Sequence, residues 1–178
     1  MLRTLLLTIG GLGLVAGARA ADETVELDGL KAKAPADWKK GQPANQFQHA
    51  VFTLPKAAGD TDAPTLTVYF FGQGGGGGKE ANIERWKGMF KAPAGQNAKT
   101  EEFKVAGDSV TTLDVSGTYL FKARPFDPSA KAEEKPDYRM VGVIFGTKNG
   151  PYYMRLVGPA KSVEKDKKEF DEWLKSFK

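Results

Sequence analysis

Hydrophobic and polar positions alternate along much of the chain, and this pattern predicts strands more often than helices. β-branched and aromatic residues fill several runs that are bounded by glycine, proline, asparagine or aspartate, which is typical of strands. These runs span residues 25–34, 46–54, 65–71, 100–106, 109–120, 138–146 and 152–157. Asp28-Gly29 and Asn149-Gly150 interrupt apolar runs with residue pairs that favour tight hairpin turns. Successive hairpins favour an antiparallel sheet.

Two segments have the periodicity of amphipathic helices. Apolar residues recur three and four positions apart over residues 80–90. A second apolar face runs through residues 162–177, and we expect the Ser162 side chain to cap the start of that helix. An antiparallel sheet of about six strands with helices packed on it is an α+β fold. The sequence shows no repeat and no second core, so we expect a single domain over residues 21–178.

Two segments fit neither pattern, and we expect both to be mobile loops. Residues 72–79 contain five consecutive glycines, and ordering so many glycines costs much backbone entropy. Residues 122–137 contain three prolines and a run of charged residues, which makes them too polar to pack.

The first twenty residues have the three parts of a secretory signal peptide. A positive start at Arg3 precedes an uncharged apolar stretch over residues 5–15 and the small residues of Ala18-Arg19-Ala20. We expect cleavage between Ala20 and Ala21, with cleavage after Ala18 as a second possibility and an uncleaved membrane anchor as the alternative. The apolar stretch is shorter than the ~20 residues that span a bilayer, and no later stretch is longer. The sequence therefore predicts a soluble periplasmic or secreted protein without a membrane span.

Composition and charge exclude several kinds of chemistry. The chain has no cysteine and one histidine, which excludes disulfides, lipid attachment through a thiol, a cysteine nucleophile and any site built on two histidines. The net charge is +4, but residues 1–20 contribute Arg3 and Arg19 and no acid, so 24 basic residues face 22 acidic ones after cleavage. Lysines in 162–177 alternate with acids, so no nucleic-acid partner is expected.

The glycine-rich segment is the most prominent candidate for binding. It follows a predicted strand and precedes a predicted helix, which is the context of a phosphate-binding loop. The candidate residues are Gly74, Gly75, Gly76, Gly77, Gly78 and Lys79. Glu80 stands where a nucleoside-triphosphate loop has serine or threonine, and five glycines match many glycine patterns by accident. A loop shaped by a partner is therefore preferred to a nucleotide site, and no cofactor is predicted.

No set of residues has the spacing of a catalytic or metal site. His49 has no acid or nucleophile at a telling spacing, so we expect a structural or surface role. Glu101 and Glu102 are adjacent on a predicted strand and face opposite ways. Asp60 and Asp62 lack the spacing of a recognised calcium loop, so we interpret them as solvated turn residues.

The aromatic residues divide into core anchors and a candidate surface. Trp38, Trp86 and Trp173 lie on apolar faces or at the ends of predicted elements, which favours core positions over a stacking platform. Tyr69-Phe70-Phe71 places three consecutive aromatics at the end of a strand, so both faces of the sheet must receive one. One face is expected under a helix, and the other is either covered by the second helix or left as a binding surface.

The layout resembles the PsbP-like α/β/α sandwich, a fold that includes an extrinsic oxygen-evolving protein of photosystem II and a Ran-binding nuclear import factor. The residues that carry the resemblance are Pro35 and Trp38, Asn149-Gly150-Pro151-Tyr152, and the closing Phe170, Trp173-Leu174 and Ser176-Phe177. The chain is also similar to uncharacterised exported bacterial proteins with the same glycine-rich loop. Neither resemblance implies a catalytic residue, and the loops over 72–79 and 122–137 depart from the plant protein.

The function predicted from the sequence is that of an exported, non-catalytic domain that binds a protein or a small ligand as a monomer. A hydrolase that uses dispersed carboxylates is the alternative. A deep pocket with convergent carboxylates or His49 would favour the hydrolase. A flat sheet face, or a groove bordered by the glycine-rich loop, would favour binding.

Overall fold

The computed structural model describes residues 23–123 and 129–178 of the chain. The expected signal peptide and its expected cleavage site at Ala20 and Ala21 lie outside the described residues. The strands are β1 (Thr24–Leu27), β2 (Leu30–Lys33), β3 (Lys39–Lys40), β4 (Gln48–Thr53), β5 (Thr65–Phe70), β6 (Lys99–Val105), β7 (Asp108–Phe121), β8 (Glu133–Phe145) and β9 (Tyr152–Pro159). The helices are α1 (Lys79–Lys87) and α2 (Ala160–Lys175), with one turn of 3-10 helix at Ala94–Asn97.

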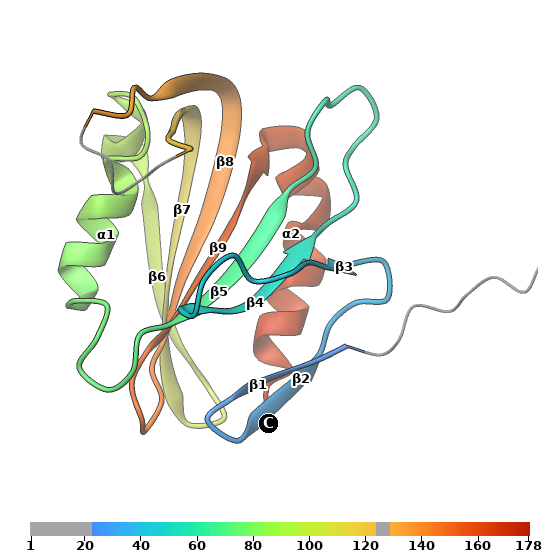
Figure 1. Ribbon diagram of the computed structural model, residues 1–178, viewed down its shortest axis with the longest axis vertical. Helices are drawn as coiled ribbons and strands as arrows, with labels where there is room; N and C mark the ends of the chain where they lie inside the picture. The colour runs from blue at the N-terminus through green and yellow to red at the C-terminus, as the bar shows by residue number, and fades with distance from the viewer. Residues whose placement is uncertain (1–22, 124–128) are drawn as a thin grey trace, which may run out of the picture.

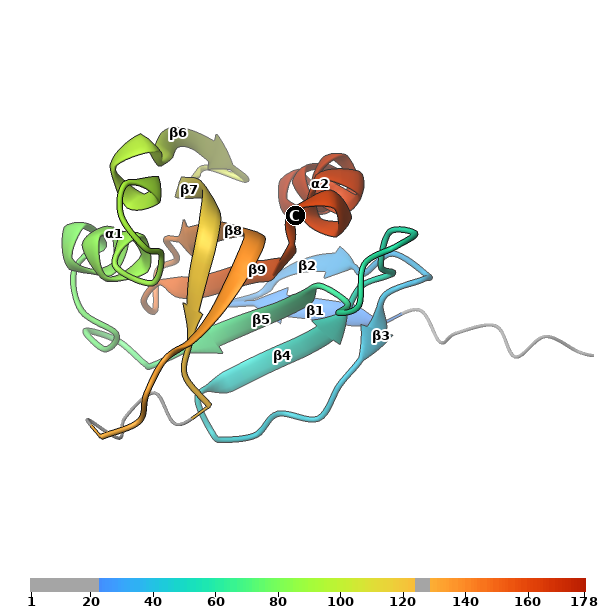
Figure 2. The ribbon, with the colours of Figure 1, turned by 90° about the horizontal axis from the view of Figure 1, so that it is seen from above.

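Seven strands form one antiparallel sheet in the order β3-β4-β5-β9-β8-β7-β6. Helices α1 and α2 lie on opposite sides of this sheet (Figures 1 and 2). The β1–β2 hairpin does not join the sheet but covers it on the side of α2. This arrangement confirms the α+β fold with an antiparallel sheet and flanking helices. No helix within residues 23–123 and 129–178 is long and apolar enough to cross a membrane.

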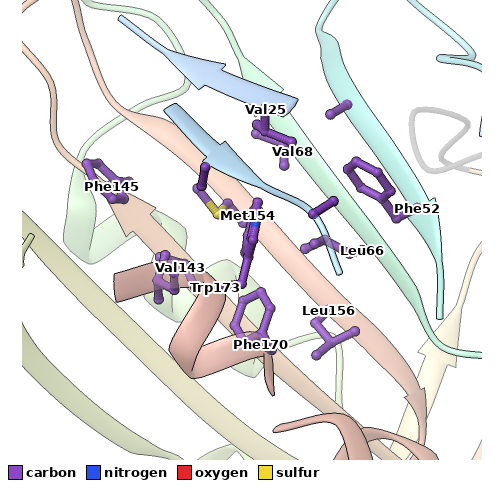
Figure 3. Close-up of a cluster of buried hydrophobic side chains, with 14 of the residues drawn as sticks. Val25, Phe52, Leu66, Val68, Val143, Phe145, Met154, Leu156, Phe170 and Trp173 are labelled. Atoms are coloured by element: carbon purple, nitrogen blue, oxygen red, sulfur yellow. The ribbon is translucent and has the colours of Figure 1, made fainter. Parts of the chain in front are cut away.

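The larger core lies between the sheet, the β1–β2 hairpin and α2 (Figure 3). Phe170 and Trp173 project from α2 onto Met154 and Leu156 of the central strand β9, and all four side chains are buried. The Trp38 ring lies 5.3 Å from that of Trp173. The buried apolar residues of α2 recur at spacings of three, four and seven positions, so they lie on the one face of the helix that meets the sheet.

A second core lies under α1 on the other side of the sheet. Its centre is Trp86, which is 2% exposed and packs on Gly142 of β8. A Cβ atom at Gly142 would lie 2.5 Å from Cε3 of Trp86, so the absence of a side chain there admits the indole ring. Trp38, Trp86 and Trp173 are all core residues, as the sequence predicts.

The start of α2 differs from the expected cap. The helix begins at Ala160, so Ser162 lies inside its first turn. The carboxylate of Asp60, in the β4–β5 loop, accepts hydrogen bonds from the backbone N–H of Ser162 at 3.1 Å and from its hydroxyl at 2.6 Å. The cap is therefore supplied by a residue 102 positions away, and sequence spacing along the helix could not reveal it.

The segment expected to be a loop over residues 122–137 is partly a strand. Residues 133–137 belong to β8, and the first three of them pair with the end of β7, with Glu133 opposite Phe121 and Lys135 opposite Tyr119. The ladder is irregular between Gly117 and Tyr119, where the pairing shifts by one residue. Charged residues are tolerated because β8 is paired only with β7 at this end. Residues 124–128 lie outside the described part of the chain.

Candidate functional site

Two open grooves lie on the side of the sheet that faces α1. Helix α1 lies beside the β6–β8 end of the sheet, and neither helix of the described residues covers β4 and β5 on that side (Figure 2). We call the first hollow the aromatic groove; its volume is about 470 Å³. It is lined by Asp62, Ala63, Thr65, Thr67, Tyr119, Phe121, Lys135, Tyr138, Arg155, Val157 and Gly158.

The alternation of strand β5 decides which aromatics reach the open side. Phe70 faces the larger core, and its ring stacks on that of Tyr152 with centroids 4.5 Å apart. Tyr69 and Phe71 point the other way, and their rings are stacked 6.0 Å apart. Phe47 extends this row, since its ring lies 5.2 Å from Phe71. The sequence left two possibilities for the second face of this strand end, cover by the second helix or an open surface, and neither helix covers it.

Arg155 lies on the floor of the aromatic groove. Strand β9 places it between Thr67 of β5 and Gly142 of β8. Its Nη2 donates a hydrogen bond to the hydroxyl of Tyr69 at 2.6 Å, and its guanidinium carbon lies 5.1 Å from the centre of that ring. Nη1 makes a weak contact with Sδ of Met89 at 3.5 Å. None of the ion pairs among the described residues involves Arg155.

The end of the β7–β8 hairpin forms one wall of the groove. The rings of Tyr119 and Tyr138 are stacked with centroids 6.0 Å apart and planes 5° apart. The Tyr138 hydroxyl donates a hydrogen bond to the Asp62 carboxylate, and Lys135 lies 3.4 Å from the same carboxylate. These contacts, led by the Tyr138 hydrogen bond, hold the pKa of Asp62 below its ordinary value, so the acid stays ionised and paired. Phe121 is 37% exposed.

The second hollow is bordered by the glycine-rich segment, and we call it the glycine-loop groove. Its volume is about 540 Å³. Among the candidate residues, Gly77, Gly78 and Lys79 line it. The Lys79 ammonium donates to Glu102 at 2.6 Å, and this hydrogen bond raises the pKa of the lysine. A phosphate would therefore meet a lysine that is already paired with a carboxylate.

Buried side chains donate hydrogen bonds to three carbonyls of the glycine-rich segment. The hydroxyl of Tyr153 donates to the carbonyl of Gly77 at 2.8 Å. The amide of Asn82, which is buried, donates to the carbonyls of Gly76 at 2.8 Å and Gly78 at 2.9 Å. Both donors come from outside the run of glycines, so composition alone gives no sign of the anchoring. The mobility of residues 72–79 stays a prediction.

The other residues singled out in the sequence do not come together. The exposed His49 ring contacts the carbonyl of Glu26 at 2.6 Å and the edge of the Tyr152 ring, on the far side of the sheet from the grooves. Asp60 caps α2 and Asp62 joins the aromatic groove. Within residues 23–123 and 129–178, no cluster of three or more histidines and acids could hold a metal ion.

One carboxylate on α2 is buried away from both grooves. Asp166 is 4% exposed, and its Oδ2 is buried without a hydrogen-bond partner. Its Oδ1 accepts a hydrogen bond from Lys165 at 3.1 Å. Burial raises the pKa of Asp166, and burial also raises the pKa of Glu169 one turn further along. These two acids line neither groove, so we treat them as structural.

We expect Asp166→Asn to stabilise the protein at neutral pH. Because burial raises the pKa of Asp166 above its ordinary value of 3.8, the folded state holds this proton more tightly than the unfolded state does. The free energy of unfolding therefore falls as pH rises from that ordinary value through the raised one. Asparagine removes this loss and the buried charge, for a gain on the order of 1 kcal/mol at pH 7.

Denaturant unfolding between pH 4 and pH 7 measures this effect. Glu172→Gln on the exposed face of the same helix is the matched control, with a change within about 0.5 kcal/mol. A less stable Asp166→Asn protein at pH 7, or an unchanged decline with pH, would contradict the prediction.

Sequence reasoning missed Arg155, Tyr119 and Tyr138. Of these three residues, Arg155 could have been found from the sequence, because it is the only charged residue in the apolar run from Tyr152 to Val157. A lone arginine within a central strand indicates a requirement for its charge on one face of the sheet. Tyr119 and Tyr138 gave no signal, since the segment between them was expected to be a loop.

Comparison with known proteins shows the fold alone. No protein-family model and no curated protein matches the chain. The solution structure of cyanobacterial PsbP (CyanoP) from Synechocystis sp. PCC 6803 is similar with a TM-score of 0.53 at 14% identity, over 97% of this chain and 98% of that one. A protein of unknown function from Pseudomonas aeruginosa, described as a putative regulator, gives a TM-score of 0.45 at 10% identity, over 86% of this chain and 94% of that one. The first likeness confirms the PsbP-like fold, and the second carries no argument.

Proposed function

We propose that this protein is an exported, non-catalytic domain that binds a small ligand in the aromatic groove. The observation that carries the proposal is a half-buried Arg155 on the floor of an open groove whose lining includes three aromatic rings. The groove volume of about 470 Å³ lies within the range of small-molecule sites. Its lining combines three aromatic rings with the charged side chains of Asp62, Lys135 and Arg155.

The distribution of acids favours binding over the alternative of a hydrolase. A pair of carboxylates that shares one substrate must converge on one cavity. Asp62 is the one carboxylate in the lining of the aromatic groove, and Glu102 is the one in the glycine-loop groove. Each is already paired with a lysine, Asp62 with Lys135 and Glu102 with Lys79.

Export is supported by the signal-peptide pattern of residues 1–20. It predicts that exported protein recovered from the producing cells begins at Ala21, and we propose separately that this protein acts as a monomer. N-terminal sequencing tests the first point, and recovery of exported protein that begins at Met1 would contradict it.

Binding in the groove is tested with a set of small aromatic compounds that includes neutral, anionic and cationic members. We expect amide NMR shifts to concentrate at the groove, around Thr67 and Val157. Thr65→Tyr fills the groove and should abolish these shifts, whereas Thr100→Tyr, at an exposed position on β6, should not. Binding elsewhere, or no binding by any compound, would contradict the proposed function.

A further inference from the structure

The two arginines on the sheet differ in their partners, and the difference identifies what the aromatic groove lacks. Arg139 is flanked by two carboxylates: Asp114 accepts from Nε at 2.8 Å and from Nη2 at 2.7 Å, and Glu164 accepts from Nη1. Arg155 is half-buried as well, yet its partners among the described residues are a tyrosine hydroxyl and a thioether. A guanidinium is always charged, and removing it from water is costly without an anion.

The groups around Arg155 add a second donor and no free carboxylate. The Tyr119 hydroxyl makes no hydrogen bond with any described residue, and Arg155 lies close enough to influence its ionisation. Burial raises the pKa of Tyr119, while Arg155 acts in the opposite direction, so the phenol keeps its proton at neutral pH. Arg155 on the floor of the groove and Tyr119 in its wall therefore both have hydrogen-bond donors available.

The single acid of the groove is already occupied. Asp62 accepts from Tyr138 and faces Lys135, which lies between it and Glu133. The Lys135 ammonium also lies 5.4 Å from the centre of the Phe121 ring, so it stands at the aromatic wall. A ligand anion at Arg155 thus meets a paired carboxylate and a second cation.

We propose that the aromatic groove binds a small organic oxyanion, a carboxylate or a phosphate monoester carried on a planar apolar body. Arg155 and the Tyr119 hydroxyl hold the oxyanion, and the rings of Tyr138 and Phe121 contact the body. A guanidinium fork suits both oxyanions. Stacked tyrosine rings suit a flat partner. This inference rests on the proposed function, because it names the class of ligand for the same groove.

Three probes with one ring system test the inference on the purified protein: naphthoate, naphthyl phosphate and the neutral naphthamide. Calorimetry measures affinity, and amide NMR shifts locate the site. We expect both anions to bind the groove at least tenfold more tightly than naphthamide. The tighter of the two anions identifies the source as a carboxylate or a phosphate ester. Higher salt should weaken the binding of both anions and leave the binding of naphthamide unchanged.

Variants separate a binding role for Arg155 from a structural one. Arg155→Met should raise the dissociation constants of both anions about tenfold to hundredfold. It should change the dissociation constant of naphthamide by less than about twofold. Arg155→Lys keeps the charge without the fork and should give an intermediate loss. Tyr119→Phe should weaken the binding of both anions several-fold and leave the binding of naphthamide unchanged. Arg85→Met, at an exposed position on α1 outside the groove, is the matched control with no change.

The outcomes distinguish this inference from the proposed function. Equal binding of naphthamide and the anions, or anion binding that survives Arg155→Met unchanged, overturns the oxyanion assignment while groove binding stands. Failure of all three probes and of the wider compound set to reach the groove overturns both.

Discussion

Replacing Trp86 with alanine should lower the free energy of unfolding by about 3–5 kcal/mol, the largest loss that we expect from a single substitution. Trp86 is 2% exposed and anchors α1 to the sheet, where its ring contacts Gly142 and the edge of Tyr153. Removal of the indole leaves a cavity over β8 that this strand cannot move to fill, because the ladders with β7 and β9 hold it along both edges. Urea unfolding measures the change.

Gly142 makes this prediction specific to one contact. Gly142→Ala places a methyl group 2.5 Å from the Trp86 ring, so it should cost about 1–3 kcal/mol in the natural protein. In the Trp86→Ala protein the same methyl group enters the empty space. There it should be neutral or stabilising by about 0.5–1 kcal/mol, because glycine weakens a strand interior. The two substitutions should therefore couple favourably, and a double-mutant cycle measures the coupling.

Additive effects of Trp86→Ala and Gly142→Ala would show that the indole does not occupy the space over Gly142. A helix α1 that kept its contacts without Trp86, seen as unchanged amide exchange in Lys79–Lys87, would equally contradict its role as the anchor.

Gly76→Ala should cost about 2–4 kcal/mol, which is a large effect for a residue within a run of five glycines. Gly76 has a φ of +80°, where a side chain is strained, and an added Cβ would lie 2.5 Å from Cε2 of Tyr153. The cost arises because the segment lies against a buried tyrosine. Thermal unfolding should show a lowered Tm.

Two neighbouring glycines separate the causes of this cost. Gly74 also has a positive φ, of +73°, but no atom lies within 4 Å of an added Cβ, so Gly74→Ala should cost only about 1–2 kcal/mol of backbone strain. Gly78 has a φ of −72° and open space, so Gly78→Ala should be neutral or slightly stabilising. Equal effects at all three positions would mean that the segment is not anchored to Tyr153.

The sequence predicted the elements well where one face of a segment meets one core. Helix α2 is an example, because its apolar residues recur along a single stripe that buries against β9. Hairpin turns were also predictable: Asp28 and Gly29 both have positive φ, as the Asp-Gly pair indicates. The end of the β7–β8 hairpin was not predictable, since residues 133–137 are polar and pair along one edge only.

The candidate site was only partly visible in the sequence. Tyr69-Phe70-Phe71 indicated aromatics on both faces of the sheet, because alternation sends consecutive side chains to opposite faces, but it did not decide whether the second face was open. The role of Arg155 could not be predicted, because its contacts are with Tyr69 and Met89, which are 86 and 66 residues away in the sequence. The same holds for Asp60, whose role as the cap of α2 depends on a loop that reaches across the fold.

The sequence by itself determined the α+β class, the antiparallel hairpins, the two amphipathic helices and the assignment of all three tryptophans to cores. These features depend on periodicities of two and 3.6 residues, which are local properties of the chain. Tertiary structure alone decided which half of the sheet stays uncovered, which arginine lacks a carboxylate, and which glycines are pressed against Tyr153. Those features depend on contacts between residues far apart in sequence, and a local pattern does not indicate which distant residue a side chain will contact.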